Sequence, residues 1–429
     1  MKLCSQDITP DSLSGAIFAL EGIRDAAVIL NGPTGCKFYH SAISDSQFPR
    51  GSSFDPLAYP EQFYFGQPRL PATCLDGYDY VYGSADKLEQ ILPAAAKGHR
   101  LAAVVNSPGA ALIGDDLKRL AKKALAGLPC VVLESTGFSG YFAEGFQNAL
   151  LKVLDCIALE RRRKIPGSVN LVGISIYHKY FAGSIKEMKR LLEMCGIEVT
   201  AVLCAGDRLR DLQNLPEASL NVVLYPEYGL ELARRLYERY DTPYLASEEG
   251  PPIGFQATEH FLRKVAGSLG ADPSPALQAL DRGRAACFQH LSRFHSLTGL
   301  PGGNAFSVKA DPSTAYALTN WLSSYLGMIP AAVETTQCGR SEFTGKLAAL
   351  LAGAGLESTL ARPVNATAAD LVFADGATIA QLKTRHGNCC GIEIALPSLG
   401  YIDVAEKSLF GPSGAMMMVE QILNALRFL

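Results

Sequence analysis

The stretch NGPTGC, Asn31 to Cys36, directly follows the apolar run DAAVIL at residues 25–30. Its two glycines allow positive φ and close backbone approach, and its proline fixes one φ and removes a donor. The pattern predicts a buried strand that ends in a tight loop carrying a thiol. In open α/β sheets, ligands bind beyond the carboxyl ends of the strands. Cys36 is therefore either a small buried side chain or a group presented to a ligand.

Outward from this loop, the sequence alternates between apolar runs, Gly- or Pro-containing turns and amphipathic segments. Strands are expected at 26–30, 78–83, 101–106, 169–177, 197–204, 219–225, 306–310, 331–336, 370–376 and 389–396. Helices are expected at 112–127, 145–163, 185–196, 229–240, 314–328 and 414–428. This alternation predicts an α/β fold with mostly parallel sheets. Breaks near Pro166 and at 297–305 divide the chain into predicted domains at 1–165, 166–298 and 299–429.

Composition excludes several classes of protein. The 429 residues include 39 basic and 42 acidic side chains, so a strongly basic nucleic-acid or membrane surface is not expected. No apolar run reaches the roughly 18 residues of a membrane span, and the first residues lack a signal-peptide core. We expect a cytoplasmic protein. Its eleven cysteines argue against a disulfide framework and leave buried, reactive or metal-binding thiols.

Three cysteines in turn-like contexts are candidate metal ligands: Cys4, Cys36 and Cys74. All three belong to the first predicted domain, so their loops could meet at one sheet edge, where soft thiolates suit iron–sulfur ligation. The alternative is three unrelated buried residues, because their spacing matches no CxxC pattern. Cys389 and Cys390 lead into an apolar strand, so we expect burial there rather than a metal site.

Two further segments carry weaker signals. His40 would lie one turn beyond Cys36 if the loop runs into a helix, where it could hydrogen-bond a cluster or donate a proton. The segment SPGAALIGDDL, 107–117, is explained by a helix capped by Ser107, with Asp115 and Asp116 early in that helix. The sequence has no GxxxxGK[ST] loop, so this chain is not expected to hydrolyse ATP itself.

Five segments together resemble nitrogenase component 1 and its relatives, among them protochlorophyllide reductase, the nickel–tetrapyrrole reductive cyclase and cofactor-maturation scaffolds. They are SLSGAIFALEGIRDAAVILNGPTGCKFYHS (12–41), YVYGSADKLEQIL (80–92), ALIGDDL (111–117), NLVG with IKEMKRLLEMCGIEV (170–173, 185–199) and LGYIDVAEKSLFGPSGAMMMVEQILNAL (399–426). The resemblance implies three Rossmann-like domains around a central cleft. It also implies an iron–sulfur cluster, of 4Fe-4S type, at an interface with a homologous subunit in a homodimer or heterotetramer. A separate ATP-dependent iron–sulfur reductase would deliver the electrons.

The resemblance transfers to individual residues unevenly. Cys36 matches a cluster ligand, and the family's earlier ligand falls on Asp11, with Cys4 as its competitor. The third family ligand falls on Ser107, and Cys74 matches a position that is often cysteine in relatives. We therefore expect Cys36, Cys74, Cys4 and Asp11 to be the cluster-binding candidates, with a partner chain completing the site.

The ligands of the nitrogenase active-site cofactor are absent, because their positions fall near Tyr225 and Phe410. This argues against dinitrogen as the substrate and leaves a cavity near Tyr225 and Tyr228 for an organic substrate, a tetrapyrrole or a second metal cofactor. We expect an oxidoreductase subunit, with His40 and Tyr225 as candidate catalytic groups. A metallocofactor scaffold and a non-catalytic structural paralogue in a heteromer remain the alternatives.

Overall fold

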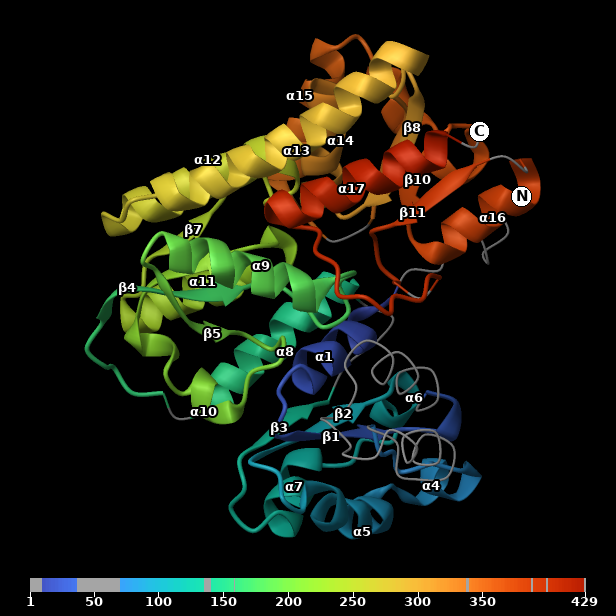
Figure 1. The fold of residues 1–429 in the computed structure, drawn as a ribbon. Coiled ribbons are helices and arrows are strands. Elements are labelled where there is room, and N and C mark those ends of the chain that lie inside the picture. Colours follow the sequence, from blue (N-terminus) through green and yellow to red (C-terminus); the bar gives the residue numbers. More distant parts are fainter. Residues whose placement is uncertain are drawn as a thin grey trace.

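The chain forms three separate β-sheets, each parallel throughout (Figure 1). The computed structural model describes residues 10–36, 70–134, 140–157, 159–336, 339–386, 389–398 and 400–427. Each sheet uses strands that are consecutive in the sequence, and helices pack around it. The predicted α/β class with parallel sheets is confirmed. The domain limits at 165 and 298 stay predictions.

The first sheet, which we call the N-terminal sheet, has the strand order β1-β2-β3. Its strands are β1 (Ala26–Asn31), β2 (Leu101–Asn106) and β3 (Cys130–Leu133). All six residues of β2 are buried, as expected for the central strand of a parallel sheet covered on both faces. The accompanying helices are α1 (Ser12–Glu21), α4 (Gly77–Tyr82), α5 (Ala85–Ala96), α6 (Pro108–Ala111), α7 (Leu117–Ala124) and α8 (Phe142–Cys156).

The strand predicted at 78–83 is wrong, because this segment is helix α4. Asp76 accepts hydrogen bonds from the Tyr78 and Asp79 amides, at 2.9 and 3.4 Å. The Asp79 carboxylate accepts in turn from the Asp76 amide at 2.7 Å. These reciprocal bonds form a capping box, which nucleates a helix where the alternating tyrosines had indicated a strand.

The helix predicted over 112–127 is too long, because α6 ends before it at Ala111 and only α7, Leu117–Ala124, lies within it. Ser107 caps α6 by accepting from the Ala110 amide at 3.3 Å, as predicted. Asp116 is not inside that helix but caps α7, accepting from the Arg119 amide at 3.0 Å. Two caps within ten residues give two short helices instead of one long one. Similarly, the helix predicted over 145–163 ends at Cys156 in α8.

The other two sheets have four strands each. The middle sheet has the order β5-β4-β6-β7, with β4 (Ile165–Val172), β5 (Glu198–Val202), β6 (Ala218–Val223) and β7 (Tyr244–Ala246). Its helices are α9 (Phe181–Met194), α10 (Leu209–Leu212), the 3₁₀ turn η2 (Leu215–Glu217) and α11 (Pro226–Tyr240). The C-terminal sheet has the order β11-β10-β8-β9, with β8 (Ala305–Ala310), β9 (Ile329–Thr335), β10 (Leu371–Ala374) and β11 (Cys390–Glu393).

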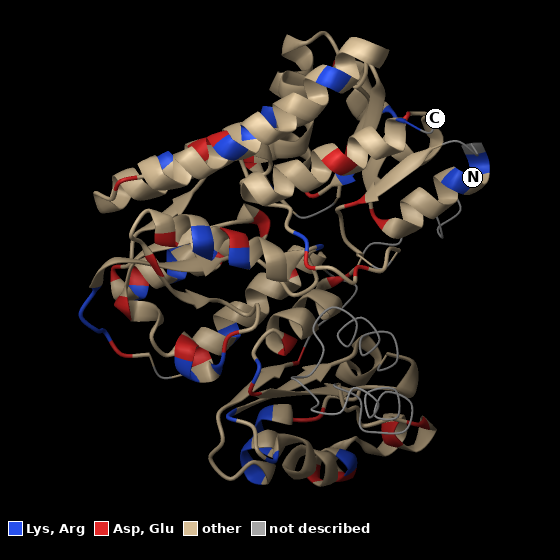
Figure 2. Cartoon of the chain, viewed as in Figure 1, with Lys and Arg blue, Asp and Glu red and all other residues tan. Residues whose placement is uncertain are grey.

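Long helices surround the C-terminal sheet and extend beyond it (Figure 1). They are α12 (Gly254–Leu269), α13 (Ser274–Thr298), α14 (Pro312–Leu326), α15 (Glu342–Gly353), α16 (Gly376–His386) and α17 (Gly411–Leu426), with 3₁₀ turns η3 (Glu357–Ala361) and η4 (Val364–Ala366). Figure 2 shows that basic and acidic residues alternate along the helices around all three sheets. No helix in the described ranges combines the length and the apolar character needed to cross a bilayer.

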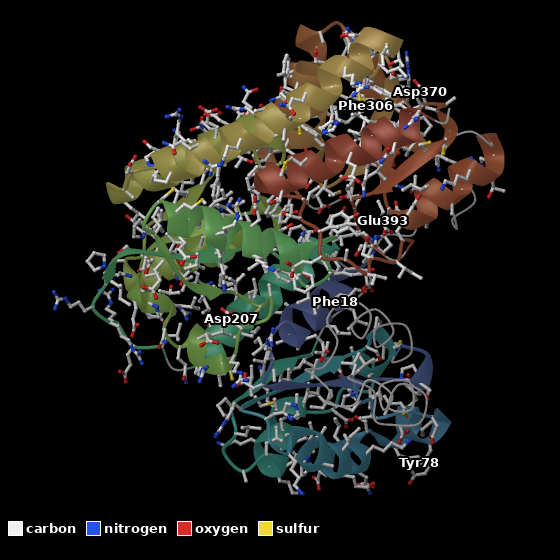
Figure 3. The ribbon with its side chains drawn as sticks, in the orientation of Figure 1. Phe18, Tyr78, Asp207, Phe306, Asp370 and Glu393 are labelled. Atoms are coloured by element: carbon white, nitrogen blue, oxygen red, sulfur yellow. The ribbon has the colours of Figure 1, made fainter. Side chains whose placement is uncertain are left out.

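Helices α1 and α8 join the N-terminal sheet to the rest of the molecule. A Cβ on Gly15 would lie 2.0 Å from the Phe142 carbonyl oxygen, and one on Gly145 would lie 1.9 Å from the Ser12 carbonyl oxygen. Only glycine permits this close crossing of two helix backbones. At the far end of α1, Phe18 stacks on Tyr177 after β4, with ring centroids 4.4 Å apart (Figure 3).

Candidate functional site

The first candidate site is the carboxyl edge of β1 and β2, which we call the thiol edge. The segment 70–75 lies beside the end of β1, where Ala72 bridges Leu30 in parallel. The Leu75 amide then donates to the Gly32 carbonyl oxygen at 3.0 Å. These bonds bring the segment that carries Cys74 next to the loop that carries Cys36. The two loops lie side by side at this sheet edge, and the predicted convergence of all three cysteine loops stays a prediction because Cys4 lies outside the described residues.

A buried network of amides and hydroxyls fixes the end of β1. The Asn31 side chain donates to the Asn106 side-chain oxygen at 2.8 Å and accepts from the Thr73 hydroxyl at 2.9 Å. The Thr73 hydroxyl oxygen also accepts from the Gly32 amide at 3.0 Å. Sequence reasoning missed this network, although an asparagine ends both AAVILN and LAAVVN. Such a network holds the loop after β1 in one conformation, because each buried polar group depends on its neighbours.

Ser107 occupies the position expected of the third ligand and is 1% exposed. Its amide donates to the Asn31 carbonyl oxygen at 2.8 Å, and its hydroxyl caps α6. A Cβ on Gly32 would lie 2.7 Å from this hydroxyl oxygen, so the glycine is required for the loop to pass. The structure therefore gives Ser107 a packing and capping role at the thiol edge.

Asp11 and Cys36 lie within electrostatic range of each other. Asp11 caps α1 by accepting from the Ser14 amide at 3.0 Å. Burial, and secondly the Asp11 charge, raise the pKa of the half-buried Cys36 thiol. A bound metal ion would displace the thiol proton and reverse this preference, because thiolate is the metal-binding form. Asp11, which was predicted to share the site, therefore lies close enough for its charge to act on the Cys36 thiol.

Helix α4 adds an aromatic surface to this edge. Tyr80 lies close to α6, since a Cβ on Gly109 would be 3.1 Å from the Tyr80 hydroxyl oxygen. Burial, then the neighbouring Cys36 and Asp79, raise the Tyr80 pKa. Tyr78 and Tyr82 point outward with 68% and 72% of their surfaces exposed, and their rings lie 4.5 Å apart (Figure 3). The sequence analysis missed this surface because it assigned the segment to a strand.

The structure thus brings Cys36, Cys74, Asp11 and Ser107 to the thiol edge, whereas Cys4 and His40 lie outside the described residues. The chemistry of two thiols and a carboxylate fits an iron–sulfur cluster, although no group of three or more metal-binding side chains occurs within the described ranges. Elsewhere, Cys389 is buried and Cys390 is partly buried, consistent with the expected packing role.

The second candidate site lies between the middle and C-terminal sheets and contains Tyr225. Its ring stacks on His178 with a centroid separation of 4.2 Å and parallel planes. Phe410 lies 5.4 Å from Tyr225, and Tyr228 contacts His178 edge-on at 4.6 Å. All four side chains are at least nine-tenths buried. We call these four residues the aromatic cluster. The two tyrosines that were expected to line a cavity pack against other rings instead.

Two carboxyl groups lie next to the aromatic cluster. Glu227 accepts from the Ser313 amide at 2.8 Å and from the Ser313 hydroxyl at 2.7 Å. Asp311 accepts from the Tyr228 hydroxyl at 2.6 Å and also from Thr336. Burial and the Asp311 charge raise the Glu227 pKa to about 7, and burial raises the Asp311 pKa. Like charges in a buried site disfavour double ionisation, so the pair retains a proton near neutral pH.

Burial keeps the remaining polar rings neutral. It lowers the His178 pKa to about 3 and raises the pKa of the Tyr225 phenol far above its ordinary value. The Ser175 amide donates to His178 Nδ1 at 2.9 Å, so the imidazole proton lies on Nε2. Tyr225 can consequently act only as a neutral phenol. Its catalytic role stays a prediction.

Comparison with known proteins gives the relatives of this chain. It is 28% identical over 291 residues to the nitrogenase iron–molybdenum cofactor biosynthesis protein NifE of Nostoc sp. (strain PCC 7120), covering 65% of this chain and 56% of NifE. It is 26% identical over 325 residues to a subunit of the light-independent protochlorophyllide reductase of Methylocella silvestris, covering 74% of this chain and 59% of that subunit. The alignments thus span little more than half the length of these relatives.

The fold of this chain is also similar to that of a solved protein structure. A solved chain described as nitrogenase Cp1 at pH 6.5 superimposes with a TM-score of 0.76 and 18% identity, covering 98% of this chain and 93% of that one. The model of the family described as nitrogenase component 1 type oxidoreductase matches residues 12–427. The thiol edge, the three parallel sheets and this match together place the chain in the nitrogenase component 1 type oxidoreductase family.

Proposed function

We propose that this chain is the subunit of a nitrogenase-like reductase that receives low-potential electrons through an iron–sulfur cluster at the thiol edge. The electrons would come from an ATP-dependent iron–sulfur reductase and would reduce a substrate other than dinitrogen. The observation that carries the proposal is the convergence of Cys36, Cys74 and Asp11 on one sheet edge in a chain of this family. The light-independent protochlorophyllide reductase, to one of whose subunits this chain is related by sequence, is named for a reductase activity.

In this proposal Cys36, Cys74 and Cys4 hold the cluster, and Asp11 is the carboxylate that completes or neighbours it. When bound, the cluster supplies single-electron transfer at a potential set by its burial and hydrogen bonds. The chain's own contribution is to fix the two cysteine loops through the Asn31 network. A second contribution is the partial burial of Cys36, which limits solvent contact with the cluster.

A homologous partner subunit is proposed to cover the aromatic surface of α4. Exposed aromatic and aliphatic side chains gathered next to a site are typical of protein interfaces. They are Tyr78, Val81, Tyr82 and, after α6, Leu112, with 68–88% of each exposed. Because this surface adjoins the thiol edge, a partner seated on it could supply the ligands that the described part of this chain lacks.

The experiment is anaerobic purification of the chain, alone and co-expressed with candidate partner subunits, followed by iron and acid-labile sulfide analysis and reduced-state EPR. The proposal expects a cluster signal that falls at least tenfold in Cys36→Ala and in Cys74→Ala. Cys195→Ala is the matched control, because Cys195 is a buried thiol at the end of α9, and its iron content should equal that of the parent.

The same preparation distinguishes a reductase subunit from a cofactor scaffold. A scaffold is the function that the name of NifE suggests. A reductase subunit oxidises its cluster when substrate and the ATP-dependent reductase are supplied, and a scaffold does not turn over. Absence of iron and sulfide under every pairing would contradict both and favour a structural paralogue.

A further inference from the structure

We propose that the junction between the middle and C-terminal sheets holds no metal cofactor in this chain, because the aromatic cluster fills the place with the chain's own side chains. The resemblance puts the two cofactor ligands of nitrogenase near Tyr225 and near Phe410. In this structure these rings lie 5.4 Å apart, which is direct contact and leaves no room for a metal cluster between them. The inference rests on the proposed function only in assigning metal to the thiol edge.

The rings are anchored and cannot turn aside without breaking buried hydrogen bonds. His178 is fixed through Nδ1 by the Ser175 amide, and Tyr228 is fixed through its hydroxyl by Asp311. Tyr225 stacks on His178 at 4.2 Å, and its ring centroid lies 6.3 Å from that of Tyr228. A buried donor or acceptor left without a partner destabilises the fold, because it has lost its hydrogen bonds to water and gains none in return. Making room for a cofactor between these rings would break several of these buried hydrogen bonds and also the packing of the rings against one another.

The donor atoms at the junction are also unsuited to an iron–sulfur or related cofactor. They are phenols, a neutral imidazole and carboxyl groups already bonded to hydroxyl donors, whereas such cofactors take soft thiolates. His178 Nε2 has no hydrogen-bond partner within the described residues and, in the tautomer that the Ser175 amide selects, carries the imidazole proton, so it could bind a metal only after losing that proton. It therefore provides the sharpest test.

The test measures bound metal directly. The full chain with its partner subunit is purified anaerobically, and iron, nickel, molybdenum and vanadium per chain are determined by mass spectrometry. Five proteins are compared: the parent, Cys36→Ala/Cys74→Ala, the same double variant with His178→Gln added, His178→Gln and Tyr225→Phe. His178→Gln retains an acceptor for the Ser175 amide, and Tyr225→Phe retains the ring, so both should fold.

We expect the double cysteine variant to lose at least nine-tenths of the bound metal. The two aromatic-cluster variants, His178→Gln and Tyr225→Phe, should bind as much metal as the parent. Metal that survives in the double cysteine variant and is lost when His178→Gln is added would overturn the inference. A parent that binds no metal at all would contradict the proposed function while leaving the junction free of cofactor. The two failures are thus distinguishable.

Discussion

The thiol edge and the aromatic cluster occupy equivalent places, each beyond the carboxyl ends of parallel strands, yet they are built from opposite chemistry. At the thiol edge, glycines and a polar network leave two cysteines partly accessible. At the aromatic cluster, buried rings pack against one another. Ligands of α/β sheets bind at such places as a general rule; the first of these two edges is open enough to follow it, and side-chain volume closes the second. Strand topology creates a place for a site, and the residues after each strand decide whether it is open.

The largest effect should come from removing a ring of the aromatic cluster. Phe410→Ala should lower the free energy of unfolding by about 3–5 kcal/mol, because it leaves a cavity in a tightly packed interior. Tyr82→Ala is the matched control on α4 and should change stability by about 0.5 kcal/mol or less, since its ring is 72% exposed. Urea unfolding of both variants tests this, and equal losses would remove the distinction between the two regions.

The buried carboxyl pair should make stability depend on pH. The native pKa of Glu227, about 7, lies above its unfolded value of 4.5, so the native state binds more protons between these values. Its contribution is fully present below pH 4.5 and is lost as the pH rises through 7. Each unit of pKa difference between the native and unfolded states corresponds to about 1.4 kcal/mol of stability. The stability of the parent relative to Glu227→Gln should therefore fall by about 3 kcal/mol from pH 4.5 to 8.

Urea unfolding of the parent and of Glu227→Gln at several pH values measures this difference. A flat difference between parent and Glu227→Gln would show that Glu227 is ionised throughout.

The packing of the thiol edge depends on Gly32. Gly32→Ala should cost about 1–3 kcal/mol, because its Cβ would lie 2.7 Å from the Ser107 hydroxyl oxygen. Gly35→Ala in the same loop is the control, since a Cβ there meets nothing within 4 Å. Thermal unfolding and iron uptake should both fall in the first variant and remain at parental levels in the second. Similar behaviour of the two variants would argue against a tightly held loop.

The smallest effect concerns the charge at the thiol edge. Asp11→Asn retains a helix cap but removes the negative charge that helps to raise the Cys36 pKa, so this pKa should fall. The rate of Cys36 alkylation at pH 8 in the metal-free protein, read by peptide mass spectrometry, should rise a few-fold. Asp116→Asn, which also retains a cap, should leave the rate unchanged. No change in Asp11→Asn would show that burial alone raises the pKa.

Much of the architecture was predictable because apolar runs and turn residues carry local information. The runs AAVIL, LAAVVN and SLNVVLY correspond to β1, β2 and β6, and Ser107 caps a helix as its sequence context suggested. The proximity of the Cys36 and Cys74 loops did not follow from the predicted topology, because the strand expected directly after Cys74 is helix α4. The bridge between Leu30 and Ala72 and the hydrogen bond from the Leu75 amide to Gly32 bring the two loops together instead.

Three features could not be predicted because they depend on contacts distant in sequence or on competing local signals. The tyrosines of α4 alternate as in a strand, and the capping box at Asp76 outweighs that pattern. The cavity expected near Tyr225 is occupied because His178 and Phe410, from two other segments, pack against it. The raised pKa of Glu227 arises partly from Asp311, 84 positions away along the chain.

The close crossing of α1 and α8 has a consequence for how the molecule unfolds. Residues 13–21 of α1 are all buried, and Phe18 stacks on Tyr177 while Asp11 caps the opposite end near Cys36. This helix cannot fray without exposing apolar surface shared by two sheets, so its amides should exchange with solvent only in the global opening reaction. A ligand gained at the thiol edge should therefore slow hydrogen exchange not only in its own loops but also in the middle sheet. The N-terminal and middle sheets would then behave as one cooperative unit.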